Sequence, residues 1–414
     1  MTGSELVRGD RTDLNGSFYA REAVALGLEP ARISIVGDRA DELEDAIRDG
    51  IRAELCLISG GLGPTHDDRT VELVARCTGR ALVVDAALEA EIEAVSRRAA
   101  ERFGRPYAEF ATGVTKQATL PEGAISLGRA GTAPGIVLDT GSCVLVVLPG
   151  PPAELQRLWP RALETEPVRR VLERAEPPRR TVLRFFGVSE SGVAKALAEA
   201  GGDGGGVEVT ICARDFEIHV DLLAEPGGEE QAAALAAALR VPLGRWLFGE
   251  DERPIERLVL DRCRELGLTL ATAESCTGGL VSARLTAVPG ASDVYLGGIV
   301  SYSNEVKEQQ LGVAADAIRE YGAVSAEVAV AMAKGAQQRL GADVAVAVTG
   351  VAGPGGGTSD KPVGLVHLHA EGPYGARSVR LELPGDRAAI RARSTVVALH
   401  LLRRVLTQSR DEDV

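Results

Sequence analysis

Apolar residues follow two spacings along the chain, and segments of the two kinds alternate. Spacing of three to four residues predicts amphipathic helices, and short apolar runs predict strands. In the first 174 residues, the predicted helices are 17–28, 41–52 and 89–104, and the predicted strands are 31–37, 54–61 and 141–152. A stretch rich in turn residues, 121–135, precedes the last strand. We therefore expect a parallel, three-layer α/β domain over residues 1–174.

A smaller module is predicted after a proline-containing linker at 176–180. Its elements follow in the order strand, helix, strand, strand, helix, over 181–187, 189–200, 207–213, 217–224 and 229–239. This order is typical of a small α+β connector, and the glycine-rich stretch 200–206 predicts a flexible loop. Residues 179–248 show no cluster of catalytic side chains, which favours a spacer or interface role over a binding site.

The last domain, residues 253–408, again alternates helices and strands. Its predicted helices are 254–267, 305–312, 325–340 and 386–406. Its predicted strands are 268–275, 296–303, 343–353, 363–370 and 378–383. We expect a second three-layer α/β domain here, followed by an acidic tail, 411–414, that is disordered.

Composition restricts the class of protein. Of the 414 residues, 45% are hydrophobic, 25% are charged and 4% are aromatic, the balance of a globular protein with a core mainly of Ala, Val and Leu. No apolar run approaches the roughly 20 residues that span a bilayer, and the first residues do not resemble a signal peptide. We therefore expect a cytoplasmic protein that makes no membrane contact.

The net charge of −13 is unevenly distributed. Residues 253–414 hold 18 basic and 18 acidic side chains, so the first 252 residues, with 28 and 41, carry the whole excess. An acidic chain without basic clusters favours no direct nucleic-acid binding. The six cysteines are scattered singly, which predicts free, buried thiols rather than disulfides or a zinc site.

A serine turn is the most informative segment of the chain. The strand over 268–275 runs into Ser275-Cys276-Thr277-Gly278-Gly279, and a helix-compatible stretch follows. A glycine-permitted turn between a strand and a helix would expose the serine hydroxyl and present free backbone N–H groups. Such groups can stabilise an oxyanion or hold a phosphate. The competing interpretation is an ordinary capping residue before a helix.

A lysine in the next strand–helix unit supplies a base for that serine. Lys307 begins a polar helix five residues after Tyr302. A serine hydroxyl is a weak nucleophile, and no histidine lies in a suitable motif. Partial burial lowers the pKa of a lysine enough for it to act as a base. Taken alone, Lys307 would be interpreted as a solvated surface residue.

Two further segments could complete a pocket. Residues 349–357, at the end of the strand over 343–353, contain five glycines. Thr349 lies at the carboxyl end of this strand. Gly350 and Gly353 allow a ligand to approach the backbone. Arg387 begins the last helix, and arginine is the natural bidentate partner of a phosphate. In open α/β sheets the carboxyl ends of strands usually bind the ligand.

Together these segments resemble the C-terminal domain of the CinA (competence/damage-inducible) family, which also occurs as the stand-alone nicotinamide-nucleotide amidase PncC. The resemblance rests on AESCTGG, SYSNEVK, VTGVAGPGGG with KPVG, and PGDR, in this order. It implies hydrolysis of nicotinamide mononucleotide to nicotinate mononucleotide and ammonia, in the recycling of pyridine nucleotides and without a cofactor. Ser275 would be the nucleophile and Lys307 its base, with Tyr302 and Thr349 beside them. Arg387 would bind the substrate, together with the backbone of Thr277, Gly278, Gly279, Gly350 and Gly353.

The first domain carries a second candidate site at SGGLGPTHDD, residues 59–68. A glycine turn can cradle an anion, and Asp67 with Asp68 could hold a divalent metal. With KQATLPEGA, GTAPG and LPGPPAEL, this segment resembles the CinA N-terminal domain, which is similar to the MoaB/MogA molybdopterin-binding fold. The resemblance implies metal-dependent hydrolysis of ADP-ribose. Gly60, Gly61, Gly63 and Lys116 would lie near the phosphates.

Two features depart from that family's pattern. A hydrophobic strand commonly precedes its GTELL-type motif, whereas this chain begins at TGSELVRG. Either the start has been assigned too late or the central sheet lacks a strand, which would expose apolar neighbours at a cost of several kcal/mol. An arginine commonly precedes KQA, whereas this chain has ATGVTKQA.

Two alternatives to the amidase stay open. One is a metal-dependent ADP-ribose pyrophosphatase with an inactive C-terminal domain. The other is a non-catalytic partner protein in DNA uptake or repair. Base rates and the resemblance both favour a homodimer.

Overall fold

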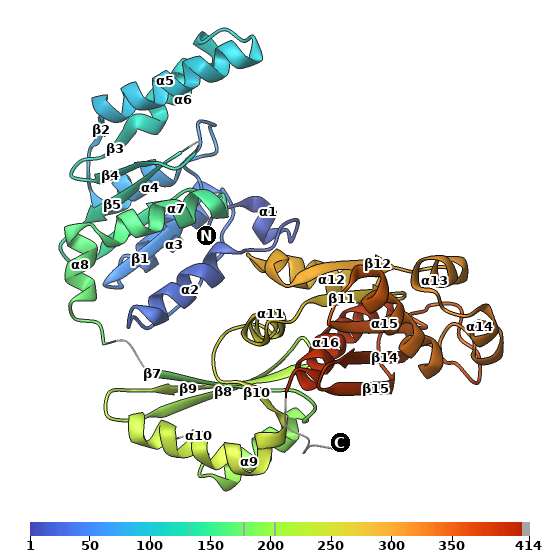
Figure 1. Ribbon diagram of the computed structural model, residues 1–414. Helices are drawn as coiled ribbons and strands as arrows, with labels where there is room; N and C mark the ends of the chain where they lie inside the picture. The colour runs from blue at the N-terminus through green and yellow to red at the C-terminus, as the bar shows by residue number, and fades with distance from the viewer. Residues whose placement is uncertain (132, 177–178, 203, 408–414) are drawn as a thin grey trace. The chain divides into compact units, whose positions relative to one another are not determined.

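The computed structural model describes residues 1–131, 133–176, 179–202 and 204–407 and divides the chain into two compact units, Met1–Pro178 and Arg179–Val414 (Figure 1). The predicted acidic tail, 411–414, lies outside the described residues, as do parts of the predicted linker and of the glycine-rich loop. Among the described residues, no helix is both long and apolar enough to cross a membrane.

The first unit contains a four-stranded sheet in the order β1-β6-β5-β4. These strands are β1 (Leu55–Ser59), β6 (Val144–Leu148), β5 (Pro134–Asp139) and β4 (Ile125–Arg129). Only β1 and β6 run parallel, so the prediction of an all-parallel domain is wrong. The connection from β5 to β6 spans only residues 140–143, and a parallel crossover needs a dozen or more residues. The stretch predicted as turns also contains β4.

Helices cover both faces of this sheet. The helices of the first unit are α1 (Ser4–Val7), α2 (Asn15–Ala25), α3 (Ala40–Gly50), α4 (Thr70–Thr78), α5 (Ala86–Phe103), α6 (Ala108–Ala118), α7 (Pro152–Leu163) and α8 (Glu166–Leu172). Figure 1 shows α5 and α6 extending away from this sheet, beside β2 and β3. Along β6, Val146 and Leu148 pack with α2, α7 and α8, whereas Leu145 and Val147 pack with α3, α4 and α5. This alternation confirms the three-layer prediction. A small separate ribbon joins β2 (Leu82–Val84) and β3 (Thr119–Pro121).

The strand predicted over 31–37 does not form. Among the described residues its one pairing is a parallel bridge between Val36 and Thr2, and the Thr2 N–H donates to the carbonyl of Ser59 in β1. A strand needs a neighbouring strand along its length, because its backbone N–H and C=O groups otherwise lack hydrogen-bond partners within the sheet. Apart from that contact, the outer edge of β1 is open, as expected for a sheet lacking a neighbouring strand.

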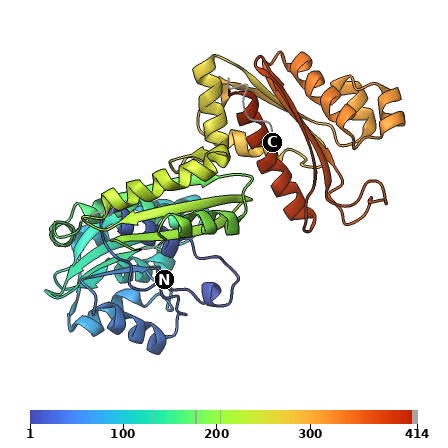
Figure 2. The same ribbon diagram turned by 90° about the horizontal axis from the view of Figure 1, so that it is seen from below.

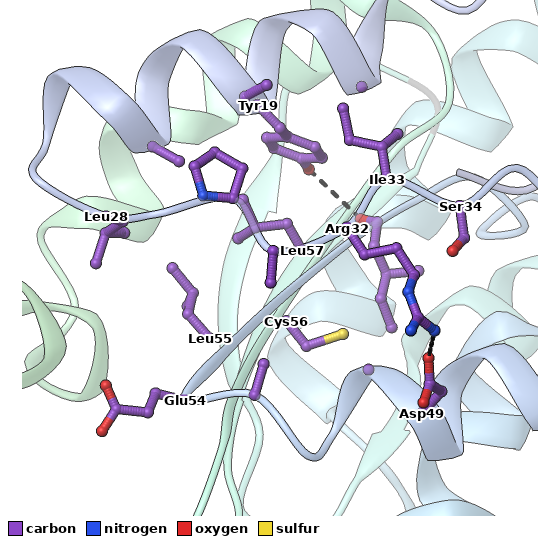
Figure 3. A pocket seen from close by; sticks show the side chains of 18 of the residues that line it. Tyr19, Leu28, Arg32, Ile33, Ser34, Asp49, Glu54, Leu55, Cys56 and Leu57 are labelled. Atoms are coloured by element: carbon purple, nitrogen blue, oxygen red, sulfur yellow. Dashed lines mark hydrogen bonds and ion pairs between the residues drawn. The ribbon is translucent and has the colours of Figure 1, made fainter. Parts of the chain in front are cut away.

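A cavity of about 720 Å³ lies beside this open edge. Tyr19, Leu28, Ile33, Leu55 and Leu57 are among its mainly apolar lining residues (Figure 3). The Tyr19 hydroxyl donates to the Ile58 carbonyl at 3.4 Å across it. An apolar cavity of this size forfeits packing that a filled core would have.

The second unit begins with a small antiparallel sheet in the order β10-β7-β9-β8. Its strands are β7 (Arg179–Phe185), β8 (Val207–Arg214), β9 (Glu217–Ala224) and β10 (Leu247–Gly249). Its helices are α9 (Glu190–Glu199), α10 (Glu229–Leu243) and the short η1 (Gly244–Trp246). These elements confirm the predicted α+β connector, with β10 as an unpredicted fourth strand.

The rest of the second unit contains a five-stranded sheet in the order β12-β11-β13-β14-β15. The strands are β11 (Leu270–Glu274), β12 (Tyr295–Val300), β13 (Val344–Gly350), β14 (Leu365–Gly372) and β15 (Gly375–Glu382). The helices are α11 (Ile255–Leu266), α12 (Leu280–Thr286), η2 (Ala291–Asp293), α13 (Asn304–Leu311), α14 (Ala315–Tyr321), α15 (Ala326–Leu340) and α16 (Arg387–Val405). The first three strands in chain order run parallel, and β14 and β15 are antiparallel to their neighbours.

Side-chain size sorts the two faces of this sheet. The valines of β13 (Val344, Val346, Val348) pack with α11, α12 and α16, whereas Ala345 and Ala347 pack with α14 and α15. Figure 2 shows α11 in yellow and α16 in red on one side of the sheet and the orange helices on the other. The arrangement confirms the predicted three layers and brings the carboxyl ends of β11, β12 and β13 together at one edge.

Candidate active site

The turn after β11 holds Ser275 in a fixed backbone conformation. The Ser275 N–H donates to the Val348 carbonyl at 2.9 Å, and the Gly278 N–H donates to the Ser275 carbonyl at 3.1 Å. Gly278 and Gly279 have φ angles of 60° and 98°, in the left-handed region that favours glycine. The two glycines of the motif therefore permit the turn, as the sequence predicts.

The turn does not expose Ser275, contrary to expectation. Its side chain is only 8% exposed, because Lys307 packs against the hydroxyl. The Lys307 Nζ lies 3.0 Å from Ser275 Oγ and also donates to the Ser301 carbonyl at 2.8 Å. At 1% exposure, Lys307 is a buried residue and not a solvated one.

Burial sets the electrostatics of this pair. It lowers the pKa of Lys307 from its usual 10.5, an effect that the neighbouring Cys276 thiol partly opposes. Among the described contacts of Lys307 there is no carboxylate that would hold its charge. A lowered pKa means that the amine loses its proton more easily. Its hydrogen-bond distance from the Ser275 hydroxyl is that of a general base from its nucleophile.

Tyr302 and Arg387 form a second group. Arg387 donates through Nη2 to the Tyr302 hydroxyl at 2.7 Å and through Nη1 to the Gly353 carbonyl at 2.8 Å. Both Tyr302 and Arg387 have exposed side chains. Tyr302, Gly353 and Arg387 lie in separate motifs of the sequence, and the fold brings them into contact.

An arginine one helical turn further on links this group to the serine turn. Arg391 donates to the carbonyls of Cys276 and Thr277 at 3.0 and 2.8 Å. Residues four apart lie on the same face of a helix, so Arg387 and Arg391 point the same way from α16. Sequence analysis did not single out Arg391, although its spacing from Arg387 was the available signal. It also missed Glu274, a carboxylate at the end of an apolar strand.

Thr349 lies at the predicted strand end, and its hydroxyl has a partner within the protein. It lies at the end of β13, beside the Ser275 turn, but its hydroxyl donates to the Ala323 carbonyl at 2.7 Å. The next residue is Gly350. A Cβ at this position would meet the Leu365 carbonyl oxygen at 2.8 Å, so a side chain does not fit there. The contact with Ala323 shows Thr349 anchoring the segment after α14.

The described histidines make their polar contacts elsewhere. His369 bonds to Ser378 at 2.7 Å, and His400 bonds to Glu217 of the small module at 2.6 Å. Burial lowers the pKa of His400 to about 4. No described contact joins a histidine to Ser275, which leaves Lys307 as its basic neighbour.

The candidate site of the first unit is more open. Asp67 is exposed, Asp68 is partly exposed, and the Thr65 hydroxyl donates to both carboxylates. Lys116 donates to the Thr65 carbonyl. Nearby lies a cavity of about 310 Å³ whose lining includes Gly61, Gly63, Asp68 and Lys116. Among the described residues, no group of three or more His, Cys, Asp or Glu side chains gathers that could hold a metal ion.

Gly60 and the end of β1 form a neighbouring polar corner. The Asn15 amide donates to Ser59 Oγ at 2.8 Å and to the Gly150 carbonyl at 2.7 Å. Within the described part of the chain, Asn15 Oδ1 and Thr2 Oγ1 are buried without a partner. Gly60 has a φ of 104°, and a Cβ there would meet Thr2 at 2.7 Å. Sequence analysis missed Asn15, which only the fold brings to this strand end.

All six cysteines are free, as predicted, but they are not all buried. Cys143, Cys263 and Cys276 are buried, whereas Cys212 on β8 is exposed. An outward-facing position on an edge strand accounts for the exposure of Cys212.

Three family models match the chain. The CinA C-terminal domain matches residues 252–406, the damage-inducible protein CinA KH domain matches 180–249, and the probable molybdopterin binding domain matches 1–167. The chain therefore contains an N-terminal domain of the MoaB/MogA type, a small connector and a CinA C-terminal domain.

Full-length relatives also match. A CinA-like protein from Mycolicibacterium paratuberculosis is 44% identical over 429 residues, covering 99% of this chain and 98% of the relative. One from Mycobacterium tuberculosis is 43% identical, covering 98% and 96%. Among solved structures, a competence/damage-inducible protein from Agrobacterium tumefaciens is 40% identical, with a TM-score of 0.36, over 38% of this chain and 99% of its own. A competence-damaged (CinA) superfamily protein from Escherichia coli is 34% identical, with a TM-score of 0.35, over 37% and 90%.

Proposed function

The chain belongs to the CinA family, and from that premise and the buried Ser275–Lys307 pair we propose that its C-terminal domain is a nicotinamide-nucleotide amidase. The reaction converts nicotinamide mononucleotide and water to nicotinate mononucleotide and ammonia. Its place would be the recycling of pyridine nucleotides.

One observation carries the proposal. The Lys307 amine lies 3.0 Å from the Ser275 hydroxyl, and burial lowers its pKa. A surface lysine would stay protonated at neutral pH and could not accept the serine proton. The same burial excludes bulk water, which strengthens every charge interaction in the site.

The chemistry follows in two halves. In the first, Ser275 Oγ attacks the carboxamide carbon while its proton moves to the neutral Nζ of Lys307. The tetrahedral intermediate collapses, Lys307 returns the proton to the leaving nitrogen, and ammonia departs from an acyl-enzyme. In the second half, water attacks the ester carbon, Lys307 takes its proton, and Ser275 leaves with that proton as nicotinate mononucleotide is released.

The substrate's other groups would meet the surrounding residues. Arg387 offers a guanidinium for the phosphate, held by Tyr302 and the Gly353 carbonyl. The backbone amides of Cys276 and Thr277, which interact with the Cys276 sulfur, directly follow Ser275 and are the candidates for stabilising the oxyanion. Gly278 and Gly279 leave room for the substrate to approach the backbone, whereas the space beside Gly350 is filled by Leu365 and Val366.

The test measures ammonia release from nicotinamide mononucleotide by purified protein, with and without a chelator. Ser275→Ala is expected to abolish release at unchanged thermal stability. Ser292→Ala, which changes an exposed serine of the same domain, is the matched control and should behave as wild type. Normal turnover by a folded Ser275→Ala protein would rule out the acyl-enzyme mechanism.

A second activity is proposed for the first unit, because its 310 Å³ cavity is lined by Gly61, Gly63, Asp68 and Lys116. Asp67 and Asp68 would hold a divalent ion. Two carboxylates suit Mg²⁺, which usually binds one or two protein carboxylates and takes its other ligands from water and substrate phosphates. The ion would polarise the phosphoryl group, while Lys116 and the glycine turn would bind the phosphates of ADP-ribose.

Metal dependence separates the two activities. Chelation and Asp68→Ala should both abolish ADP-ribose hydrolysis and leave ammonia release intact. A folded protein that turns over neither nucleotide would favour the third reading, a non-catalytic partner in DNA uptake or repair. The proposed homodimer is tested separately by light scattering.

A further inference from the structure

Glu274, the residue before Ser275, is buried in a way that needs explanation. It ends β11, whose other residues are apolar or a buried threonine, and it is 1% exposed. No described basic side chain forms an ion pair with it. A carboxylate in such a place is costly unless hydrogen bonds replace its hydration.

Four donors provide that compensation: one lies at the end of the serine turn, and three lie just beyond it. Oε2 accepts from the N–H groups of Gly279 and Val281, both at 3.0 Å. Oε1 accepts from the Ser282 N–H at 2.8 Å and from the Ser282 hydroxyl at 2.7 Å. The side chain therefore spans the turn, joining the end of β11 to the start of α12.

The brace continues into a buried hydroxyl network. The Tyr295 hydroxyl donates to Ser282 Oγ at 2.7 Å, and Thr272 Oγ1 lies 2.9 Å from both hydroxyls. Gly298, in β12, borders the same network. A Cβ there would meet Thr272, Ser282 and Tyr295 oxygens at 2.3 to 2.6 Å. Glycine at this position therefore makes room for the network.

We propose that Glu274, through Ser282 and Tyr295, is a positioning residue that holds the Ser275 turn in its reactive conformation. The middle of the turn is held by Arg391 through the Cys276 and Thr277 carbonyls. Ser275 and the amides beside it are thus fixed between two clamps, one anionic and one cationic. This inference rests on the proposed amidase for its kinetic readout.

The side chain must accept hydrogen bonds at both oxygens, because three of its four partners are backbone N–H groups, which can only donate. A glutamine has one acceptor oxygen and an NH₂ group, so Glu274→Gln sets two donors against each other and leaves a buried group unpaired. The turn would relax away from Lys307. A misplacement of about 1 Å in a catalytic group can cost on the order of 100-fold in rate.

The experiment compares wild type with Glu274→Gln, Ser282→Ala and Tyr295→Phe. The matched control is Glu256→Gln, which breaks the 2.6 Å ion pair between α11 and Arg284 of α12 without touching the turn. Each protein is measured for thermal unfolding, for kcat and KM of ammonia release, and for the rate at which Ser275 is labelled by a fluorophosphonate probe. Ser275→Ala supplies the blank for labelling.

The expected result is a fall in kcat and in labelling rate of about 100-fold for Glu274→Gln and about 10-fold for the two network variants, with KM within about threefold. Glu256→Gln should retain wild-type rates. If Glu274→Gln does not fold, Ser282→Ala and Tyr295→Phe decide by the same criteria. Unchanged kcat and labelling in the folded variants, or a change in KM alone, would overturn the positioning role.

The probe keeps this inference distinct from the proposed function. Wild-type protein that is labelled at Ser275 but releases no ammonia overturns the amidase proposal alone, and the labelling rates still decide the role of Glu274. Wild-type protein that is neither labelled nor active overturns both.

Discussion

The two candidate sites of this chain begin with the same local design and end in different environments. In each, a strand runs into a glycine turn: β1 into Gly60 and Gly61, and β11 into the segment that begins at Ser275. After the first turn, Asp67 is exposed and Asp68 is partly exposed, whereas Ser275 and Lys307 are buried. A shared turn motif therefore does not imply shared chemistry, because burial lowers the pKa of Lys307 at the second turn.

The strands beneath the turns explain the difference. β11 has β12 on one side and β13 on the other. Val348 of β13 contacts Ser275, and Ser301, directly after β12, contacts Lys307. β1 has β6 on one side and, beyond the contact with Thr2, an open edge beside a 720 Å³ cavity. A central strand thus receives site residues from two directions, and an edge strand receives them from one.

The largest expected effect comes from removing the buried base. Lys307→Met should lower ammonia release by about 1,000-fold, within the range for loss of a general base. It should not lower thermal stability, since it replaces a buried amine with an apolar side chain of similar length. Steady-state kinetics and calorimetry measure the activity and the thermal stability. Lys334→Met, on the surface of α15, is the control. A folded variant retaining a tenth of wild-type activity would show that another group accepts the proton.

The substrate side of the same site should respond less. Arg387→Ala should raise KM for nicotinamide mononucleotide by about 10- to 100-fold, the usual value of lost charge-assisted hydrogen bonds. Nicotinamide riboside, which has no phosphate, should react equally with both proteins. Arg380→Ala, in an exposed ion pair on β15, is the control. A loss that persists with the riboside would assign Arg387 another role.

The pH dependence should sharpen the contrast between a buried and an exposed amine. Because Lys307 must be neutral to act, kcat/KM should rise with pH and level off above a pKa that lies below 10.5. Between that lowered pKa and 10.5, the unfolded chain binds more protons than the folded one, so the free energy of unfolding should rise with pH. Lys307→Met should lack this rise. A rate profile that is flat down to acidic pH would contradict the assignment of Lys307 as the base.

The smallest effect on the amidase should come from the other turn. Asp68→Asn should leave ammonia release within twofold of wild type and lower the free energy of unfolding by about 1 kcal/mol at most, since Asp68 accepts hydrogen bonds from Thr65. Steady-state kinetics and denaturant titration measure both. A large loss of ammonia release would mean that the two turns are coupled, contrary to their separate environments.

Most elements of the molecule follow from local pattern. The strands β11 to β15 and the helices α11, α13, α15 and α16 form where apolar spacing places them, because each element needs one apolar face to pack. The failures occur where a partner distant in sequence decides. Residues 31–37 have a strand pattern but no ladder partner beyond Thr2, and β4 and β5 run antiparallel because of a short connection.

The candidate site divides in the same way. The sequence alone determined the strand–turn–helix around Ser275, the glycines that permit it, and the presence of a lysine and an arginine at helix starts. Only the tertiary structure decided that Lys307 is buried against Ser275, that Thr349 instead bonds to Ala323, and that Glu274 and Arg391 clamp the turn. The physical reason is that backbone conformation depends mainly on near neighbours, whereas burial and proton affinity depend on residues that only the packed sheet brings together.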